Sequence, residues 1–299
     1  MSAVAPVTGA VPRFEPALMR RKLTGTLFYG ACVGAIALLM LALVALLVDT
    51  FARAAPWLDV QFLTGVPSSR PERAGILPSI IGTLEVGVIV GLVTFPIGVG
   101  AAVYLAEYAS DSRLNRLLQT NISNLAGVPS IIYGILGLAL FVRMLALGPT
   151  VLSAALTLSL VILPVVIIAS LEALKAVPNA QREGAYALGA TRWQAVRRSV
   201  LPAAAPGIMT GIILAMARAI GEAAPLILIG AFTFVTFIPN PIAGQYTVLP
   251  IQIFGWALRP QDDFQGISAA AIVVMLGIMF LLNALALILR VRLSRHIQW

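Results

Sequence analysis

Six long apolar runs alternate with short polar stretches along the chain. They cover about 23–48, 76–104, 128–147, 151–171, 206–237 and 267–289. Each is close to or above the roughly 20 residues that a helix needs to cross a bilayer. The runs are continuous and do not alternate in polarity residue by residue, which favours helices over the strands of a membrane β-barrel. The pattern therefore predicts an all-α membrane protein with six transmembrane helices.

The runs also predict how the chain is divided. We expect a cytoplasmic tail at 1–22, a first span with its outer loop at 23–75, a core of five spans at 76–290 and a second cytoplasmic tail at 291–299. The second and fifth runs exceed one straight crossing, so these spans should be tilted, or broken near Pro96 and Pro225. A further stretch, TVLPIQIFGW, is too short to span and should lie at the interface or over the outer mouth.

Composition and the placement of charge agree with a membrane protein. Hydrophobic residues make up 60% of the chain and charged residues 11%, which excludes an ordinary soluble domain. The net charge is +8, but the basic residues flank the apolar runs, so membrane topology explains them without nucleic acid. With both termini inside, the cytoplasmic segments hold 14 Lys or Arg residues and the outer loops hold 4. This bias predicts that both termini face the cytoplasm.

Motifs for catalysis and cofactor binding are missing from the sequence. One cysteine and one histidine give neither a disulfide framework nor a metal-ligand cluster, so we expect no metal and no cofactor. No G-x-x-x-x-G-K-[ST] phosphate loop is present, and the chain is not expected to bind nucleotide in the usual way. No nucleophile elbow or pair of catalytic carboxylates occurs either. Energy for transport would have to come from a partner or from an ion gradient.

The stretch EGAYALGATRWQAVRRSVLP, residues 183–202, separates two apolar runs on the predicted cytoplasmic side. We expect Asn179 to cap a short helix that stops at Gly189, because glycine suits the left-handed position after a helix. Thr191 and Gln194 match a Thr-x-x-Gln capping box for a second short helix. That helix should end before Pro202. The stretch therefore predicts a helical knob that projects from the membrane.

The second helix of this knob has two faces with different chemistry. Arg197 and Arg198 are expected in its last turn, where the helix dipole favours cations. Trp193, Val196 and Val200 recur at helical spacing and form a narrow apolar stripe. Such a stripe can dock into the groove of a partner. The knob would then exchange force with a soluble protein.

Charged residues inside the apolar runs are candidates for a transport path. Arg218 and Glu222 lie midway along the fifth run, four residues apart, so they share a helix face. Because a lone Arg at the centre of a span costs about 2.5–3.5 kcal/mol, it should face protein or water. The pair is either a polar point that binds a tetrahedral oxyanion through the planar guanidinium, or a buried ion pair that fixes helix packing. Arg143 is a further pathway candidate or snorkels to the headgroups, and Glu85 is interfacial or pairs across the bundle.

The knob resembles the Glu-Ala-Ala signature of ABC importer permeases. Gly184 stands where the signature has its first Ala, and Ser199 where an apolar residue is usual. Longer segments are similar to the PstA family of phosphate importer permeases, and the similarity runs from about residue 75 to the C-terminus. These segments are GILPSIIGT (75–83), YLAEYA (104–109), NLAGVPSIIYGILGLALFV (124–142), the stretch 189–230 that contains RAIGE, and LPIQIFGWALRPQDDF (249–264).

This resemblance implies a type I ABC importer permease with six spans in the bacterial inner membrane. It implies a second, C-type permease subunit, two copies of a cytoplasmic ATPase, an external phosphate-binding protein and inorganic phosphate as the cargo, with lipid around the spans. The knob would be the coupling helix on the ATPase, and Arg218 would matter for the passage of phosphate. The residues expected to couple to the ATPase are Glu183, Gly184, Ala185, Gly189, Ala190, Thr191, Leu201 and Pro202.

Three other functions compete with this hypothesis. An ABC importer permease for another oxyanion or solute would carry the same knob. A membrane-embedded enzyme would use Arg218 and Glu222 as an anion site and base, but the spans offer no second polar cluster to complete an active site. A carrier driven by an ion gradient is disfavoured because the chain has no inverted six-span repeat and few protonatable groups.

Overall fold

The computed structural model describes residues 18–294 except residues 111, 233 and 243. Within this part of the chain the regular structure is helical and contains no strand, which confirms the all-α class. Most of the predicted tail at 1–22 and the last residues of the tail at 291–299 lie outside the described residues. The chain divides between Asp49 and Thr50 into two units, which are described separately.

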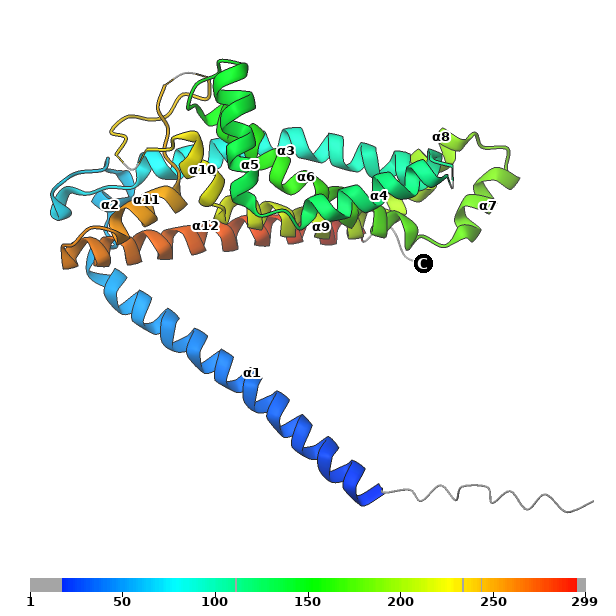
Figure 1. The fold of residues 1–299 in the computed structure, drawn as a ribbon, viewed down its shortest axis with the longest axis horizontal. Coiled ribbons are helices and arrows are strands. Elements are labelled where there is room, and N and C mark those ends of the chain that lie inside the picture. The colour runs from blue at the N-terminus through cyan, green and yellow to red at the C-terminus, as the bar shows by residue number, and fades with distance from the viewer. Residues whose placement is uncertain (1–17, 111, 233, 243, 295–299) are drawn as a thin grey trace, which may run out of the picture. The chain divides into compact units, whose positions relative to one another are not determined.

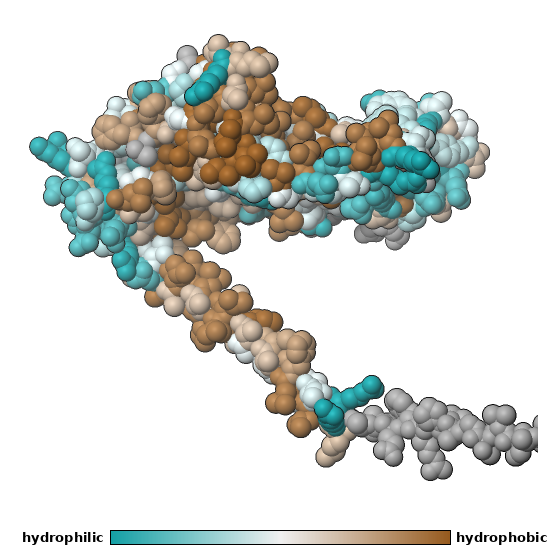
Figure 2. Space-filling view, viewed as in Figure 1, coloured by the Kyte–Doolittle hydropathy of each residue, from teal (hydrophilic) through white to brown (hydrophobic). Residues whose placement is uncertain are grey.

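The first unit consists of most of helix α1 (Leu18–Ala54). At 1.5 Å per residue, its 37 residues extend about 55 Å, well beyond the hydrocarbon core of a bilayer. Hydrophobic side chains cover its length (Figure 2), and the apolar window of this helix is 0% buried. A long apolar surface of this kind is stable when lipid surrounds it, as the predicted first span requires.

The second unit is a bundle arranged around one central helix (Figure 1). Helix α6 (Val151–Lys175) packs against α3 (Leu77–Val103) and α9 (Leu201–Gly221), while α12 (Asp262–Ser294) packs on α9. Glycines bring these helices close: a Cβ added at Gly211 would lie 2.4 Å from the Cβ of Ala169 on α6. A valine side chain of α6 fills the space beside Gly98 of α3 in the same way. Small residues thus set the helix spacing, as is usual inside membranes.

The third predicted run, 128–147, forms α5 (Ser130–Gly137) and its continuation, the π-helical segment η4 (Leu138–Met144). A further helix that the apolar pattern did not predict, α4 (Arg113–Ala126), comes directly before it. The two helices are bent by 98° at the break between them. Pro129 causes the break because it disfavours helix at the residue before it and has no N–H to donate. The described residues therefore contain five helices long enough to cross a membrane, or six if this bent pair is one span.

The two prolines expected to interrupt spans behave differently. Helix α3 continues through Pro96, so of the two alternatives, tilting or a break, the break is absent there. The fifth run does break: α9 ends at Gly221, and the short helix α10 (Ala224–Ile229) begins with Pro225 in its first turn. A proline in the first turn costs nothing, because the first N–H groups of a helix have no partner within it. The run predicted as one span at 206–237 is therefore two helices followed by a loop.

The predicted outer side of the bundle is built from short helices. TVLPIQIFGW forms most of α11 (Leu249–Ala257), which packs on α12 and α3. Thr83 of α3 accepts a hydrogen bond from the backbone N–H of Leu249 at 2.8 Å, which satisfies one free donor at the start of α11. The remaining elements near this end are η1 (Ala55–Trp57), α2 (Val60–Thr64) and η2 (Pro71–Arg73). Helices α2 and α11 lie at the opposite end of the bundle from α7 and α8 (Figure 1).

Candidate functional site

The first helix of the knob is α7 (Asn179–Ala187). The predicted cap residue, Asn179, is already its first helical residue. Pro178 occupies the N-cap position, so the expectation that Asn179 caps the helix is wrong. Pro178 is already extended (φ −58°, ψ 140°), which leaves Asn179 as the first helical residue. The Asn179 amide oxygen instead accepts a hydrogen bond from Nη1 of Arg182 at 3.3 Å.

The end of α7 agrees with the sequence prediction. Gly189 has φ +78°, the left-handed conformation that glycine adopts without cost. Its N–H donates to the carbonyl of Tyr186 at 2.9 Å, and the N–H of Ala190 donates to the carbonyl of Ala185 at 3.1 Å. These two bonds form a Schellman motif, which satisfies the last carbonyl groups of the helix. The predicted left-handed stop at Gly189 is confirmed.

The second helix begins as predicted but does not end where expected. In α8 (Arg192–Ala195), Thr191 and Gln194 form the capping box, with backbone-to-side-chain distances of 2.8 and 3.3 Å. The chain then passes through the π-helical segment η5 (Val196–Val200) directly into α9, so the predicted end before Pro202 is wrong. Pro202 cannot donate to the preceding turn. The wider π turn, in which the Leu201 N–H bonds to the Val196 carbonyl, accommodates that loss without ending the helix.

This continuity changes the surroundings of several predicted knob residues. Arg197 and Arg198 lie within a continuing helix, so they do not face the C-terminal dipole that was expected there. Val196 and Val200 are 0% exposed and pack inside the chain, so the expected docking stripe is wrong for two of its three members. The apolar side chains that the knob does expose are Tyr186 at 44%, Leu188 at 90% and Trp193 at 55%. We call these three residues the knob surface.

Hydrophilic residues gather over α7 and α8, whereas hydrophobic residues cover the middle of the bundle (Figure 2). Among the residues expected to couple to an ATPase, Glu183, Gly184 and Gly189 are exposed beside the knob surface. Four others are exposed or half-buried within the same stretch: Ala185, Ala190, Thr191 and Pro202. Leu201 is half-buried and packs against the core, so it supports the knob from within.

Arg218 and Glu222 form the ion pair that their spacing predicts. Nε of Arg218 lies 3.3 Å from Oε1 of Glu222. They are not midway along a helix, however, because α9 ends at Gly221. Arg218 is in the last turn, where unpaired carbonyl groups favour a cation, and Glu222 is the C-cap. The Arg218 side chain is 48% exposed and that of Glu222 is 18% exposed, so the pair contributes little to stability and the guanidinium is accessible.

The other two charges inside the spans are not joined to this pair. Arg143 is exposed in the last turn of η4, and no ion pair or hydrogen bond links it to Arg218 or Glu222 in the described part of the chain. Glu85 lies in α3, and its buried Oε2 has no hydrogen-bond partner among the described residues. Of the two alternatives for Glu85, pairing with an arginine across the bundle is therefore not found there.

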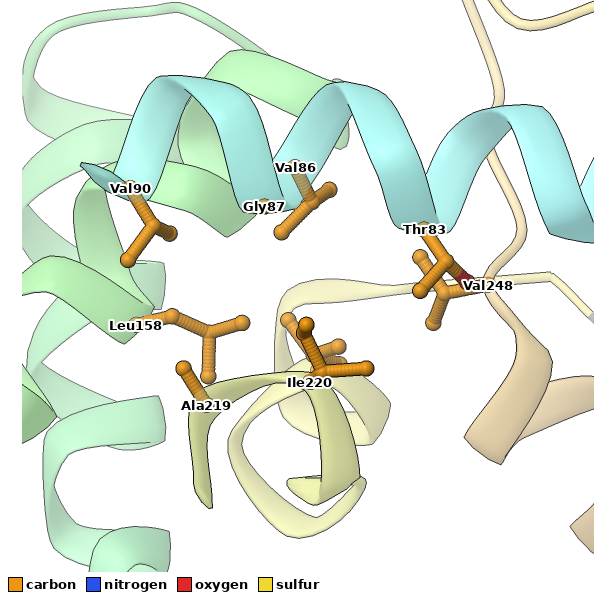
Figure 3. A pocket seen from close by; sticks show the side chains of 9 residues that line it. Thr83, Val86, Gly87, Val90, Leu158, Ala219, Ile220 and Val248 are labelled. Carbon is orange, nitrogen blue, oxygen red and sulfur yellow. The ribbon is translucent and has the colours of Figure 1, made fainter. Parts of the chain in front are cut away.

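A small apolar cavity lies beside the ion pair. Its volume is about 10 Å³, and it lies between α3, α6 and α9, lined by residues including Val86, Leu158 and Ala219 (Figure 3). This volume holds about one water molecule and is too small for an oxyanion. The described residues also contain no group of three potential metal ligands. The Arg218 side chain itself is 48% exposed, so a solute can reach it from outside this small cavity.

Sequence reasoning missed one polar feature of the knob. Arg182 forms an ion pair with Glu107, with Nη2 and Oε1 2.7 Å apart, although 75 residues separate them in the chain. Arg182 directly precedes the Glu-Ala-Ala signature, and Glu107 lies within the segment YLAEYA. Neither spacing nor periodicity connects the two segments. The only sequence signal was that Glu107 lies in a quoted segment and that Arg182 stands next to another.

Comparisons with known proteins agree with this architecture. The family described as "Binding-protein-dependent transport system inner membrane component" matches residues 95–296. The chain is 36% identical to the probable ABC transporter permease protein YqgH of Bacillus subtilis over 64% of this chain and 64% of that protein, slightly under two thirds of its length. It is 32% identical to the phosphate transport system permease protein PstA 1 of Mycobacterium tuberculosis over 92% of this chain and 91% of that protein.

A solved structure shows the same fold at low identity. It is a bacterial alginate ABC transporter in complex with an alginate-pentasaccharide-bound periplasmic protein, with a TM-score of 0.66 and 17% identity. The match covers 94% of this chain and 98% of that chain. The fold is that of the type I ABC importer permeases, and the protein is a multi-pass protein of the inner membrane. The chain belongs to the binding-protein-dependent transport system inner membrane components and, among them, to the PstA-type permeases.

Proposed function

We propose that this chain is the transmembrane permease subunit of an ATP-driven importer of inorganic phosphate. A relative that matches over most of both chains is a phosphate transport permease. In this proposal ATP is hydrolysed by a separate pair of cytoplasmic subunits. A second, C-type permease completes the pathway, and an external binding protein delivers phosphate. The permease core is the region 76–290, and the tails at 1–22 and 291–299 are cytoplasmic.

One observation carries the coupling part of the proposal. Helical structure is continuous from Arg192 in the knob to Gly221 beside the ion pair, over 30 residues. At 1.5 Å per residue this length is about 45 Å, which exceeds the hydrocarbon core of a bilayer. Arg218 lies about 25 Å further along this helix than Leu201, toward the predicted outer side. A displacement of the knob by the ATPase would therefore move the Arg218 end without an intervening hinge.

The knob surface supplies the contact for the ATPase in this proposal. Tyr186, Leu188 and Trp193 are exposed apolar side chains on a hydrophilic projection, a combination typical of a protein interface. The positive-inside distribution of Lys and Arg puts the projection in the cytoplasm, where ATP is available. Glu183 and Gly189 border this surface and would contact the ATPase directly.

The Arg218 site supplies the contact for phosphate. A guanidinium presents a planar fork of donors that fits two oxygens of a tetrahedral oxyanion. Glu222 already holds this fork through one contact of 3.3 Å, so an arriving anion competes with a carboxylate. That competition keeps the binding of phosphate weak enough for its release, which a transport path requires. Arg143 is a secondary, exposed candidate on the same path.

The test is uptake of radiolabelled phosphate in a bacterial strain that lacks its own importer. The strain would express this chain together with its permease, ATPase and binding-protein partners, with either Arg218 or Arg218→Gln. Uptake by the wild type and its loss in a correctly inserted variant support the proposal. If the assembled wild-type complex takes up no phosphate, a different solute is transported and the substrate assignment is wrong.

A further inference from the structure

One arginine of the knob uses every donor it has. Nε of Arg182 contacts both carboxylate oxygens of Glu107, at 3.0 and 3.3 Å, and Nη2 contacts Oε1 at 2.7 Å. Nη2 also donates to the Leu174 carbonyl at 3.0 Å. Nη1 donates to the Val177 carbonyl at 2.8 Å and to Oδ1 of Asn179 at 3.3 Å. All five N–H groups of the guanidinium are therefore engaged.

These partners come from three separate parts of the bundle. Arg182 lies in α7 of the knob, Leu174 lies in the last turn of α6, and Val177 follows the end of α6. Glu107 lies in the π-helical segment η3 (Tyr104–Tyr108), which extends α3 to make one helix over 77–108. The Glu107 side chain is 5% exposed and the Arg182 side chain 16%. One buried side chain thus ties the knob to the ends of two spans.

The same end of the second span also holds the other helix of the knob. The guanidinium carbon of Arg192, the first residue of α8, lies 5.1 Å from the centre of the Tyr108 ring, within cation–π range. Glu107 and Tyr108 are neighbours in sequence. One binds α7 through a charged pair and the other binds α8 through its ring. The end of helix 77–108 therefore contacts both halves of the knob.

Stability alone does not explain this ion pair. Burying two charges costs free energy that their attraction only partly returns, so an apolar pair of similar volume would be at least as stable. A guanidinium with five fixed donors instead specifies one orientation of α7 relative to α3 and α6. Such a rigid, directional junction transmits displacement, whereas an apolar contact allows sliding.

We propose that Arg182 and Glu107 are positioning residues that force the second span, 77–108, to move together with the knob. This inference rests on the proposed function, because it requires that the knob is driven by an ATPase. It adds a second mechanical route to the direct connection through α9. Helix 77–108 packs along α6 and reaches the cavity beside Ala219, so its movement would change the packing next to the Arg218 site. Through this ion pair, helix 77–108 and α9 would both move when the ATPase displaces the knob.

The experiment compares variants in the complete complex, reconstituted in proteoliposomes with ATPase, partner permease and binding protein. Glu107→Gln removes the charged partner, and Arg182→Lys keeps a positive charge but loses the fork. The matched control is Glu172→Gln, which breaks an ion pair at the end of α6 with a separation of 3.1 Å and side chains 49% and 65% exposed. For each protein we would measure assembly, ATP hydrolysis stimulated by the loaded binding protein, and phosphate imported per ATP hydrolysed.

We expect Glu107→Gln and Arg182→Lys both to assemble and hydrolyse ATP while the phosphate imported per ATP falls by about tenfold, a typical size for coupling between sites. The control should match the wild type. If the assembled Glu107→Gln complex imports as much phosphate per ATP as the wild type, the inference is overturned and the proposed function stays intact. If Arg182→Lys, which leaves no unpaired buried carboxylate, also fails to assemble, the pair is a folding element and the inference is equally overturned. Absence of phosphate uptake by the wild type would instead refute the proposed function.

Discussion

Two glycines in and after helix α7 should respond in opposite ways when each is replaced by alanine. Gly184 lies inside α7, and Gly189 follows its end with φ +78°. A Cβ added at either position would meet no atom within 4 Å. Gly184→Ala and Gly189→Ala therefore differ only in what they do to the backbone. Comparing the two variants therefore measures the backbone preference of alanine without any change in side-chain packing.

The magnitudes follow from the two conformations. Alanine inside a helix is favoured over glycine by roughly 0.5–1 kcal/mol, so Gly184→Ala should stabilise α7 by about that amount. Alanine in a left-handed conformation costs roughly 1–2 kcal/mol, so Gly189→Ala should destabilise the Schellman motif. The two variants should differ by about 1.5–3 kcal/mol, which corresponds to roughly a tenfold to hundredfold difference in local opening.

Hydrogen exchange followed by mass spectrometry on the complete complex measures that opening directly. Peptides covering 183–200 should exchange more slowly than wild type in Gly184→Ala and faster in Gly189→Ala, while peptides from α12 stay unchanged. Uptake of phosphate should fall only in Gly189→Ala, because alanine at residue 184 restores the usual signature residue. Slower exchange in both variants would refute the left-handed stop at Gly189 and the geometry assigned to the knob.

Three further predictions concern the path, the coupling surface and the packing. Arg218→Gln should reduce phosphate uptake far more than Arg143→Gln, since only Arg218 sits at the end of the continuous helix; the opposite order would place the path elsewhere. Glu183→Lys should leave membrane insertion and ATP hydrolysis intact but uncouple uptake, and normal uptake would remove this residue from the coupling surface. Gly211→Val should lower thermal stability by about 1–3 kcal/mol through overpacking against α6, where an added Cβ lies 2.4 Å from an alanine side chain. The control is Gly277→Val, where the added side chain meets open space, and equal destabilisation of both variants would argue against close packing of α6 and α9.

The sequence correctly predicted those features of the knob that depend only on neighbouring residues. The capping box at Thr191 and Gln194 and the left-handed Gly189 depend on a few neighbouring residues, and both were confirmed. Asn179 was assigned wrongly because Pro178 took the cap position and Arg182, three residues further on in the same helix, engaged the asparagine side chain. The continuation past Pro202 was missed because a π turn is a rare solution to a missing N–H.

The remaining differences depend on how whole helices pack. Spacing put Val196 and Val200 on one helix face, but it could not say whether that face meets a partner or the chain's own core. The ion pair between Arg182 and Glu107 joins segments 75 residues apart, and only the fold brings them together. Pairing of Arg218 with Glu222 was predictable because four residues separate them, whereas the end of α9 at Gly221, between the two residues, needed the structure.

The places where prolines break a helix, and the continuation of the helix past Pro202, favour transmission of force through α9. Proline interrupts the chain at Pro129 and ahead of Pro225, and in both places the backbone changes direction. At Pro202 the helix continues instead, because η5 shifts the hydrogen bonds by one residue and keeps the Leu201 N–H bonded to the Val196 carbonyl. A hinge at Pro202 would let the knob rotate while Arg218 stayed still. Continuous hydrogen bonding removes that freedom, and the first break in the helix comes only after Arg218, at Glu222 and Ala223.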